Sequence, residues 1–252
     1  MEIINEKYKL YQGDCLEVMD KLIEEGVKVD MILTDPPYGT TACKWDSIIP
    51  LDEMWERLNK LIKPNGAICL FAQTPFDKVL GASNLEMLRY EWIWEKEQGT
   101  GGLNAKRMPL KKHENILVFY KKLPTYNPQF TEGEPYVIKR PRVSGVYKGI
   151  GTIDGYISKN DGRRYPVSII KFSRDVKNRY HPTQKPVALL EYLMKTYTNE
   201  GDLILDFTMG SGSTGVACMN ANRKFIGIEL DEKYFNIAKE RIANTRRQKR
   251  LF

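Results

Sequence analysis

Hydrophobic residues along this chain follow two different spacings, and the first third of the chain shows both. Residues 29–33 (VDMIL) form a short continuous apolar run, which is typical of a buried strand in a parallel sheet. Apolar residues then recur at helical spacing over 51–62, and Pro64-Asn65-Gly66 is expected to end that helix. Further strands are predicted at 67–71, 90–94 and 116–120.

The last third of the chain repeats this alternation. Helical spacing is found over 187–197, 214–221 and 231–244. The apolar runs between these helices predict strands at 203–206 and 225–229. Because strands alternate with helices, we expect an α/β fold whose mostly parallel sheet is covered by helices on both faces.

The middle of the chain, residues 97–180, has a different character. Glycine, proline, tyrosine and basic residues are frequent there and helical periodicity is weak, which predicts a loop-rich insertion. Residues 96–185 hold 19 Lys and Arg against 7 Asp and Glu, whereas the whole chain has a net charge of +7. Positive charge gathered in one stretch indicates contact with nucleic acid. The candidate contacts are arginines of this region: Arg140, Arg142, Arg163, Arg164, Arg174 and Arg179.

The composition argues against several other classes of protein. No apolar run approaches the roughly 18–20 residues of a membrane-spanning helix. The N-terminal sequence lacks the apolar core of a signal peptide. The four cysteines form no CxxC pair, so neither a zinc site nor a disulfide framework is expected. A cytoplasmic protein without a bound metal is therefore predicted.

A glycine-rich loop follows the predicted strand at 203–206. Gly210, Gly212 and Gly215 have the spacing G-x-G-x-x-G, which lets the backbone approach a ligand at the start of a helix. Glu229 follows 19 residues after Gly210, where an acid can accept hydrogen bonds from ribose hydroxyls. Such a loop suits a methyltransferase and a dinucleotide-dependent enzyme about equally, and glycines can also serve only a tight turn. The 37 residues after Gly215 are too few for the remaining strands of a dinucleotide-binding domain.

The tetrapeptide Asp35-Pro36-Pro37-Tyr38 comes directly after the apolar run VDMILT. In a parallel sheet, ligands bind outside the carboxyl ends of the strands, which is where this tetrapeptide falls. Two prolines stiffen the backbone and remove two N–H donors, so that the carbonyls of Asp35 and Pro36 can face a ligand. These acceptors and the Tyr38 ring suit the exocyclic amino group of a nucleobase that has left its duplex. We expect the tetrapeptide and the glycine loop to meet at the same edge of the sheet.

These two motifs, in this order and with the basic region between them, resemble the β class of amino DNA methyltransferases. Two further stretches are similar to segments of that family. They are 13–17, whose Asp corresponds to the residue that contacts the cofactor adenine, and 181–186, which corresponds to the segment beside the methionine end of the cofactor. The family loop usually reads Asp-Pro-Phe-x-Gly-Ser-Gly-Thr-Thr, whereas here 206–214 lacks the proline and has its aromatic residue one place earlier. The resemblance covers nearly the whole chain.

The resemblance implies a circularly permuted, Rossmann-like S-adenosylmethionine-dependent methyltransferase fold. The catalytic half is then expected at 1–96, the target recognition region at 97–180 and the cofactor-binding half at 181–252. It also implies S-adenosyl-L-methionine as cofactor and double-stranded DNA as substrate. A monomer or homodimer is expected, and a cognate restriction nuclease is a partner that such an enzyme can have. The residues implied to bind the cofactor are Asp14, Lys185, Asp206, Phe207, Gly210, Ser211, Gly212 and Glu229.

The implied reaction is direct transfer of a methyl group to an exocyclic amino group. The catalytic residues are then the motif itself, in which Asp35 and the Pro36 carbonyl hold the amino group, Pro37 stiffens the turn and Tyr38 stacks on the flipped-out base. Asp in the first motif position, in place of Ser, favours N6 of adenine, and N4 of cytosine is the nearest alternative. A nicotinamide-dependent dehydrogenase and a non-catalytic DNA-binding module are alternatives from other classes, but neither gives this motif a task.

Overall fold

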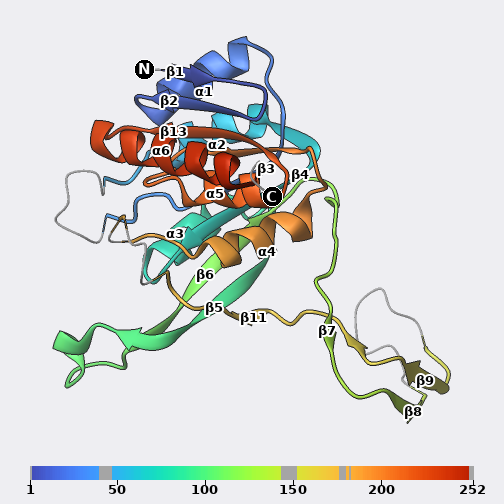
Figure 1. Cartoon of the computed structure of the whole chain (residues 1–252). Coiled ribbons are helices and arrows are strands. Elements are labelled where there is room, and N and C mark those ends of the chain that lie inside the picture. Colours follow the sequence, from blue (N-terminus) through green and yellow to red (C-terminus); the bar gives the residue numbers. More distant parts are fainter. Residues whose placement is uncertain (1, 40–46, 143–151, 176–179, 182, 250–252) are drawn as a thin grey trace. The chain divides into compact units, whose positions relative to one another are not determined.

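The computed structural model describes residues 2–39, 47–142, 152–175, 180–181 and 183–249 of the chain. These residues form two compact units. The larger unit combines Met1–Asn127 with Ser168–Phe252, and the smaller one is Pro128–Val167 (Figure 1). Residues of the larger unit that are far apart in the sequence therefore share one fold.

The larger unit is built on a nine-stranded sheet. The strand order is β1 (Glu2–Ile4), β2 (Tyr8–Gln12), β13 (Lys224–Glu229), β12 (Leu203–Asp206), β3 (Val29–Thr34), β4 (Ile62–Ala72), β6 (Lys111–Phe119), β5 (Leu88–Thr100) and β11 (Ile169–Lys171). The five strands from β2 to β4 in this order are parallel to one another, whereas β1 pairs antiparallel with β2, and β6 pairs antiparallel with β4 and β5. The predicted mostly parallel α/β fold is confirmed.

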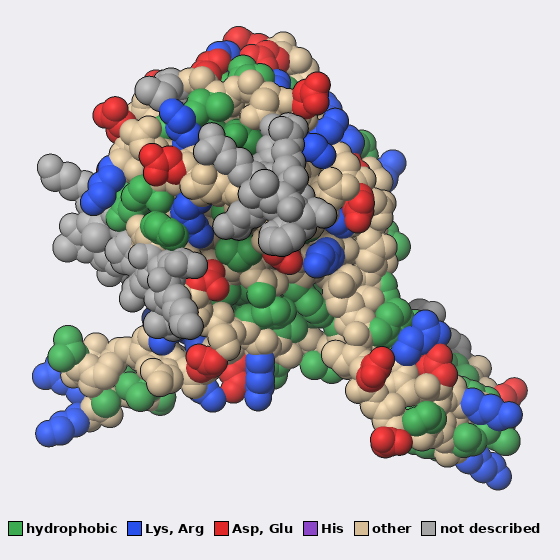
Figure 2. Space-filling view, viewed as in Figure 1, with side chains coloured by type: hydrophobic (Ala, Val, Ile, Leu, Met, Phe, Trp, Pro, Cys, Tyr) green, Lys and Arg blue, Asp and Glu red, His purple; other side chains and the backbone are tan. Residues whose placement is uncertain are grey.

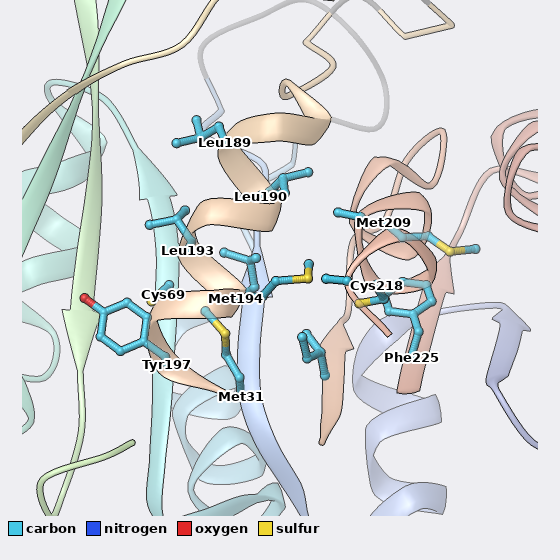
Figure 3. Close-up of a cluster of buried hydrophobic side chains, with 14 of the residues drawn as sticks. Met31, Cys69, Leu189, Leu190, Leu193, Met194, Tyr197, Met209, Cys218 and Phe225 are labelled. Carbon is cyan, nitrogen blue, oxygen red and sulfur yellow. The ribbon is translucent and has the colours of Figure 1, made fainter. Parts of the chain in front are cut away.

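Helices cover both faces of this sheet. They are α1 (Cys15–Glu24), α2 (Leu51–Leu61), α3 (Phe76–Ala82), α4 (Val187–Tyr197), α5 (Ser213–Asn220) and α6 (Glu232–Lys249). Because side chains alternate along a strand, successive residues of β3 enter two different hydrophobic clusters. Met31 packs with residues of α4, α5 and α6, such as Leu193 and Met194 (Figure 3), whereas Ile32 packs with residues of α1, α2 and α3.

Most predicted elements are present, but the end of α2 differs from the expectation. We expected Pro64-Asn65-Gly66 to terminate the helix, whereas α2 already ends at Leu61 and this tripeptide lies inside β4. The pairing of β3 with β4 shifts register there, since Val29 pairs with Ile62 and Met31 with Ala67. A proline, which has no N–H to donate, is tolerated in a strand at such an irregularity.

The smaller unit consists of two short antiparallel pairs. One pair is β8 (Tyr136–Arg140) with β9 (Tyr156–Asn160), and the other is β7 (Thr131–Glu132) with β10 (Arg163–Arg164). The unit is narrower than the insertion predicted at 97–180, because β6 and β11, which lie in that range, pair with strands of the nine-stranded sheet. The range 97–180 lacks helical periodicity partly because β6 and β11 are strands, so it does not consist of loops throughout.

Strands β5 and β6 continue past the sheet as a projecting hairpin. Its residues 101–113 are exposed and include the short 3-10 helix Gly102–Asn104. Figure 2 shows Lys, Arg and hydrophobic side chains at the tip of this projection. Among the residues that the structure describes, no helix is both long and apolar enough to cross a membrane, and no three His, Cys, Asp or Glu side chains are grouped to hold a metal ion.

Candidate active site

A cavity of about 650 Å³ lies at the carboxyl edge of the sheet, within the range of about 300–1,000 Å³ usual for small-molecule sites. The adjacent parallel strands β2, β13, β12 and β3 all end at this edge. Asp14 follows β2, Glu229 ends β13, Phe207 follows β12 and Asp35 follows β3, and all four residues line the cavity. Four segments that are separate in the sequence therefore contribute to one site, as expected for an open parallel sheet.

The tetrapeptide and the glycine loop lie side by side, as we predicted. The Thr208 hydroxyl donates to the backbone carbonyl of Asp35 at 3.1 Å, and it lies 2.7 Å from the hydroxyl of Thr34. Thr34 in turn donates to Asp206 at 2.6 Å. The Asp35 carbonyl, which we expected to face a ligand, is thus used inside the protein, because the pairing of β12 with β3 brings Thr208 within reach.

The Asp35 carboxylate is partly buried and accepts two hydrogen bonds. Tyr38 donates its hydroxyl to Oδ1 at 2.5 Å, and Lys185 donates from Nζ to Oδ2 at 2.5 Å. Burial raises the pKa of the Asp35 carboxyl above its ordinary value, and the Lys185 ammonium offsets part of that shift. Lys185, a predicted cofactor-binding residue, therefore contacts the predicted catalytic carboxylate directly.

Two residues that the sequence analysis did not single out extend this ion pair. Lys185 Nζ lies 3.1 Å from Glu114 Oε2, and Lys96 pairs with Glu114 Oε1. Burial alone would raise the pKa of Glu114, but the two lysines hold it below its ordinary value. Burial alone would lower the pKa of Lys185, but Asp35 and Glu114 hold it above its ordinary value. Lys96 and Glu114 lie on β5 and β6, and both line the cavity.

The ring of Tyr38 is contacted by Phe76 and Lys185. Phe76 stacks on it with a centroid distance of 5.3 Å and an interplanar angle of 28°. Lys185 Nζ lies 5.8 Å from the centroid of the same ring. Pro36 and Pro37 line the cavity beside Tyr38. The whole tetrapeptide therefore borders the cavity, and the Phe76 contact holds the Tyr38 ring in place.

Glu229 connects the glycine loop to β13. Its carboxylate accepts the backbone N–H of Gly210 at 2.8 Å and that of Asp231 at 2.9 Å. Burial raises the pKa of the Glu229 carboxyl. Gly210 has a φ of +52°, and a side chain there would meet no atom within 4 Å. This glycine therefore leaves its side of the loop open.

Gly212 and Gly215 both lie against α6. A Cβ at Gly212 would lie 2.8 Å from the Cβ of Ala238, and one at Gly215 would lie 2.3 Å from Ile242 Cδ1. Both contacts are with α6, so the missing side chains let this part of the loop and α5 pack closely on α6. That the loop backbone approaches a ligand at these two positions stays a prediction.

The remaining predicted cofactor residues of the loop are held from inside the protein. Asp206 accepts the Thr214 hydroxyl at 2.6 Å, and burial raises the pKa of Asp206 to about 6. Arg241 donates from Nη1 to the Ser211 carbonyl at 2.5 Å and to the Ser211 hydroxyl at 2.9 Å. Phe207 is almost fully buried although it lines the cavity. Arg241, on α6, was not foreseen because 30 residues separate it from Ser211.

Asp14 caps the first helix. Its Oδ1 accepts the backbone N–H of Leu16 at 2.8 Å and of Glu17 at 3.3 Å, which is the usual N-cap arrangement. The second carboxylate oxygen of Asp14 is not used in these two bonds, and Asp14 lines the cavity. A residue implied to contact the cofactor thus also determines where α1 begins.

The arginines proposed for nucleic-acid contact have different surroundings. In the smaller unit, Arg164 donates to the Glu134 carbonyl and to Asn160, so it stabilises that unit. Arg163 pairs with Asp161 at 2.9 Å and Arg142 with Asp154 at 3.4 Å. Arg140 is exposed, and Arg174 lines the cavity of the larger unit. Arg179 lies outside the described residues.

Several known proteins are similar to this chain in sequence or in structure. A family model described as DNA methylase (N6_N4_Mtase) matches residues 29–240. The type II methyltransferase M.HpaI of Haemophilus parainfluenzae is 32% identical over 250 residues, which cover 93% of this chain and 74% of that protein. The DNA adenine methyltransferase YhdJ of Escherichia coli strain K12 is 29% identical over 259 residues, which cover 94% of this chain and 83% of that protein. The crystal structure of an M1.HpyAVI–SAM complex has a TM-score of 0.67 at 27% identity and covers 93% of this chain and 98% of that chain.

Proposed function

The chain belongs to the DNA methylase family described by this model, and from that premise we propose that it methylates N6 of adenine in double-stranded DNA with S-adenosylmethionine as methyl donor. The observation that carries the proposal is the contact between the two motifs, in which Thr208 of the glycine loop donates to the carbonyl of Asp35. A donor bound at the loop and an amino group held at Asp35 are then neighbours, as methyl transfer requires.

The cavity has the features that this cofactor needs. Each oxygen of Glu229 accepts one backbone N–H, and a carboxylate oxygen has a second lone pair with which it can accept a ribose hydroxyl. Apolar side chains that can pack against an adenine ring line the same cavity, among them Leu16, Ile49 and Leu230. We propose that Asp14, at the start of α1, accepts a hydrogen bond from the adenine of the cofactor.

The residues of the tetrapeptide hold the target base. When bound, S-adenosylmethionine supplies an electrophilic methyl group on a positively charged sulfur. Asp35 accepts an N–H of the target amino group with a second lone pair of a carboxylate oxygen, since Tyr38 and Lys185 each use one lone pair, and the Pro36 carbonyl accepts the second N–H. Both bonds turn the nitrogen lone pair away from the ring and toward the methyl group. Tyr38, which borders the cavity, stacks its ring on the flipped-out base.

A proton must leave the amino group after the methyl group arrives. The nitrogen then carries one hydrogen too many, and the Asp35 carboxylate already contacts one of its N–H groups. Burial raises the pKa of Asp35, which makes this carboxylate a better proton acceptor than an exposed one. Asp35 therefore serves as hydrogen-bond acceptor before the transfer and as proton acceptor after it.

We propose that residues 97–180, the target recognition region, bind DNA. In the sequence this region follows a catalytic half at 1–96 and precedes a cofactor-binding half at 181–252. Lys106, Arg107, Lys111 and Lys112 lie on the exposed hairpin, and no Asp or Glu occurs between 98 and 113. In the smaller unit, Lys139, Arg140 and Lys159 are exposed on β8 and β9. Clusters of one sign attract the phosphate backbone.

N4 of cytosine is the second candidate target. It presents an exocyclic amino group with the same two hydrogens, and the family model covers enzymes of both kinds. Asp35 in the first motif position supports adenine, on resemblance to the family. YhdJ, which carries the name adenine methyltransferase, is similar over 94% of this chain.

Nucleoside analysis tests the reaction and separates the two targets. The purified protein is incubated with mixed-sequence duplex DNA and S-adenosylmethionine labelled in its methyl group, and the DNA is then digested to nucleosides. We expect the label in N6-methyldeoxyadenosine. Label in N4-methyldeoxycytidine would replace adenine by cytosine as the target, and unlabelled DNA would refute the proposed activity. An Asp35→Ala variant is the control for a contaminating methyltransferase.

A further inference from the structure

Four charged side chains meet at one end of the cavity and form a continuous chain of ion pairs. Lys185 lies between Asp35, at 2.5 Å, and Glu114, at 3.1 Å, and Lys96 pairs with the other oxygen of Glu114. The side chains of Lys185, Lys96 and Glu114 have 8%, 10% and 11% of their surface exposed. Two positive and two negative groups balance, so this charge cluster is neutral as a whole.

Bulk water screens this cluster only in part, because three of its four side chains are about nine-tenths buried and the side chain of Asp35 is 23% exposed. Interactions between buried charges extend further and are stronger than between exposed ones. A change of one charge in the cluster is therefore felt across the cavity that all four residues line. Within the cluster, only Lys185 pairs with Asp35 of the tetrapeptide. Lys96 and Glu114 act on Asp35 through Lys185.

We propose that Lys96 and Glu114 hold this cluster at zero net charge, and that this balance determines how strongly the site prefers the charged methyl donor over the demethylated product. The inference rests on the proposed function, because it assumes that S-adenosylmethionine binds in this cavity. The donor carries a sulfonium, whereas the product, S-adenosylhomocysteine, carries a neutral thioether and otherwise the same groups. The sulfur comes near Asp35, since the methyl group must reach an amino group held there.

The neutral balance has a chemical reason. A cluster with one surplus positive charge repels the sulfonium and weakens donor binding relative to product, which slows turnover by product inhibition. A cluster with one surplus negative charge binds the donor more tightly before the reaction, and ground-state binding of this kind does not accelerate the transfer. Lys185 with Asp35 and Glu114 alone would be negative, and Lys96 cancels that surplus.

The test compares donor and product binding in variants that change the charge of the cluster in opposite directions. Dissociation constants for S-adenosylmethionine and S-adenosylhomocysteine are measured by titration calorimetry without DNA. Glu114→Gln leaves one surplus positive charge, and the ratio of donor to product dissociation constants is expected to rise about tenfold. Lys96→Gln leaves one surplus negative charge, and the ratio is expected to fall by a similar factor.

Two further variants keep the test decisive. The double variant Lys96→Gln/Glu114→Gln restores neutrality, and its ratio is expected to return to within about twofold of the parent. Glu95→Gln also removes one negative charge, from the residue before Lys96. Glu95 pairs with Lys112 and Lys171 outside the cavity, so the ratio of donor to product dissociation constants is expected to stay unchanged. Melting temperatures identify any variant that has lost its fold.

The outcomes distinguish this inference from the proposed function. If Glu114→Gln and Lys96→Gln shift both dissociation constants equally, or shift the ratio in the same direction, the residues serve only packing and the inference is wrong. In that case the parent protein still binds both ligands and the proposed function stands. If the parent protein binds neither ligand, the cofactor assignment itself fails.

Discussion

Replacing Asp35 with alanine removes the carboxylate that we place against the target amino group. The variant loses the acceptor for the Tyr38 hydroxyl and for Lys185, both at 2.5 Å. It leaves the contact of Lys185 with Glu114 at 3.1 Å in place. The cavity therefore keeps its overall architecture, and the lost group is the one that would orient the amino nitrogen and take its proton.

The size of the effect follows from these contacts. Removing one preorganised hydrogen-bonding group that acts on the reacting centre usually costs a factor of about 10²–10³ in kcat, and loss of the proton acceptor adds to this. Breaking a buried ion pair completely costs about 3–5 kcal/mol of stability. Because Lys185 retains Glu114 as a partner, we expect the free energy of unfolding to fall by less, about 1–3 kcal/mol.

The assay measures kcat at saturating DNA and donor, together with binding of S-adenosylhomocysteine by calorimetry. We expect kcat to fall at least about 10³-fold while the dissociation constant of this product, whose sulfur carries no charge, stays within about twofold. Asp30→Ala is the matched control, because Asp30 lies on β3, the strand that Asp35 follows, and its ion pair with Lys63, at 2.7 Å, is outside the cavity. It should lower stability without changing kcat.

One result would refute the reasoning. If Asp35→Ala retained more than about a tenth of the parent kcat with product binding intact, the carboxylate could not be the acceptor of the amino group, since the lost contact is worth at least 10²-fold. Loss of product binding together with kcat would instead mean that the substitution disturbs the cofactor site.

The structure supports four further predictions. Asp206 has a pKa raised by burial to about 6 from 3.8, so the folded protein holds this proton more tightly than the unfolded chain and the free energy of unfolding falls by about 2 kcal/mol as pH rises from about 4 to 6. Asp206→Asn should remove that contribution, and urea unfolding at both pH values would show an unchanged pH dependence if the assignment is wrong. Gly212→Ala places a Cβ 2.8 Å from Ala238 at a φ of +79°. It should lower the free energy of unfolding by about 1–3 kcal/mol more than Gly201→Ala does, since φ is +85° at Gly201 but the space is open. Equal losses of unfolding free energy would contradict close packing on α6. Thr208→Val removes the hydroxyl that joins the two motifs and should lower kcat more than it lowers product affinity, whereas an unchanged kcat would separate Thr208 from the positioning of Asp35. Alanine at Lys106 and Arg107 should make the fall of log K for DNA binding with log salt less steep, by about one unit of slope for each lost phosphate contact. Alanine at Lys60, on α2, should leave this slope unchanged. An unaltered slope in the first variant would exclude the hairpin from the DNA interface.

Local features of the sequence were sufficient to predict most of the elements of the core. Apolar runs and helical spacing depend on neighbouring residues, so the strand β3, the helices α4 and α6 and the alternation at the C-terminus could be read directly. The helix α1 was also marked, by Asp14 followed by apolar residues at helical spacing, but we interpreted Asp14 only as a cofactor residue. Prolines and glycines likewise indicated the two motifs, because stiffness and flexibility of the backbone are properties of a short stretch.

The sequence by itself determined that a proline-stiffened acidic motif and a glycine loop each follow a buried strand. Only the tertiary structure decided which side chains surround them. Lys96 and Glu114 join Asp35 through Lys185, Thr208 reaches the Asp35 carbonyl, and Gly212 packs on α6. These contacts connect residues up to 173 positions apart, and they depend on which strands are neighbours in the sheet. Strand order results from the packing of the whole chain, so no local pattern of residues contains it.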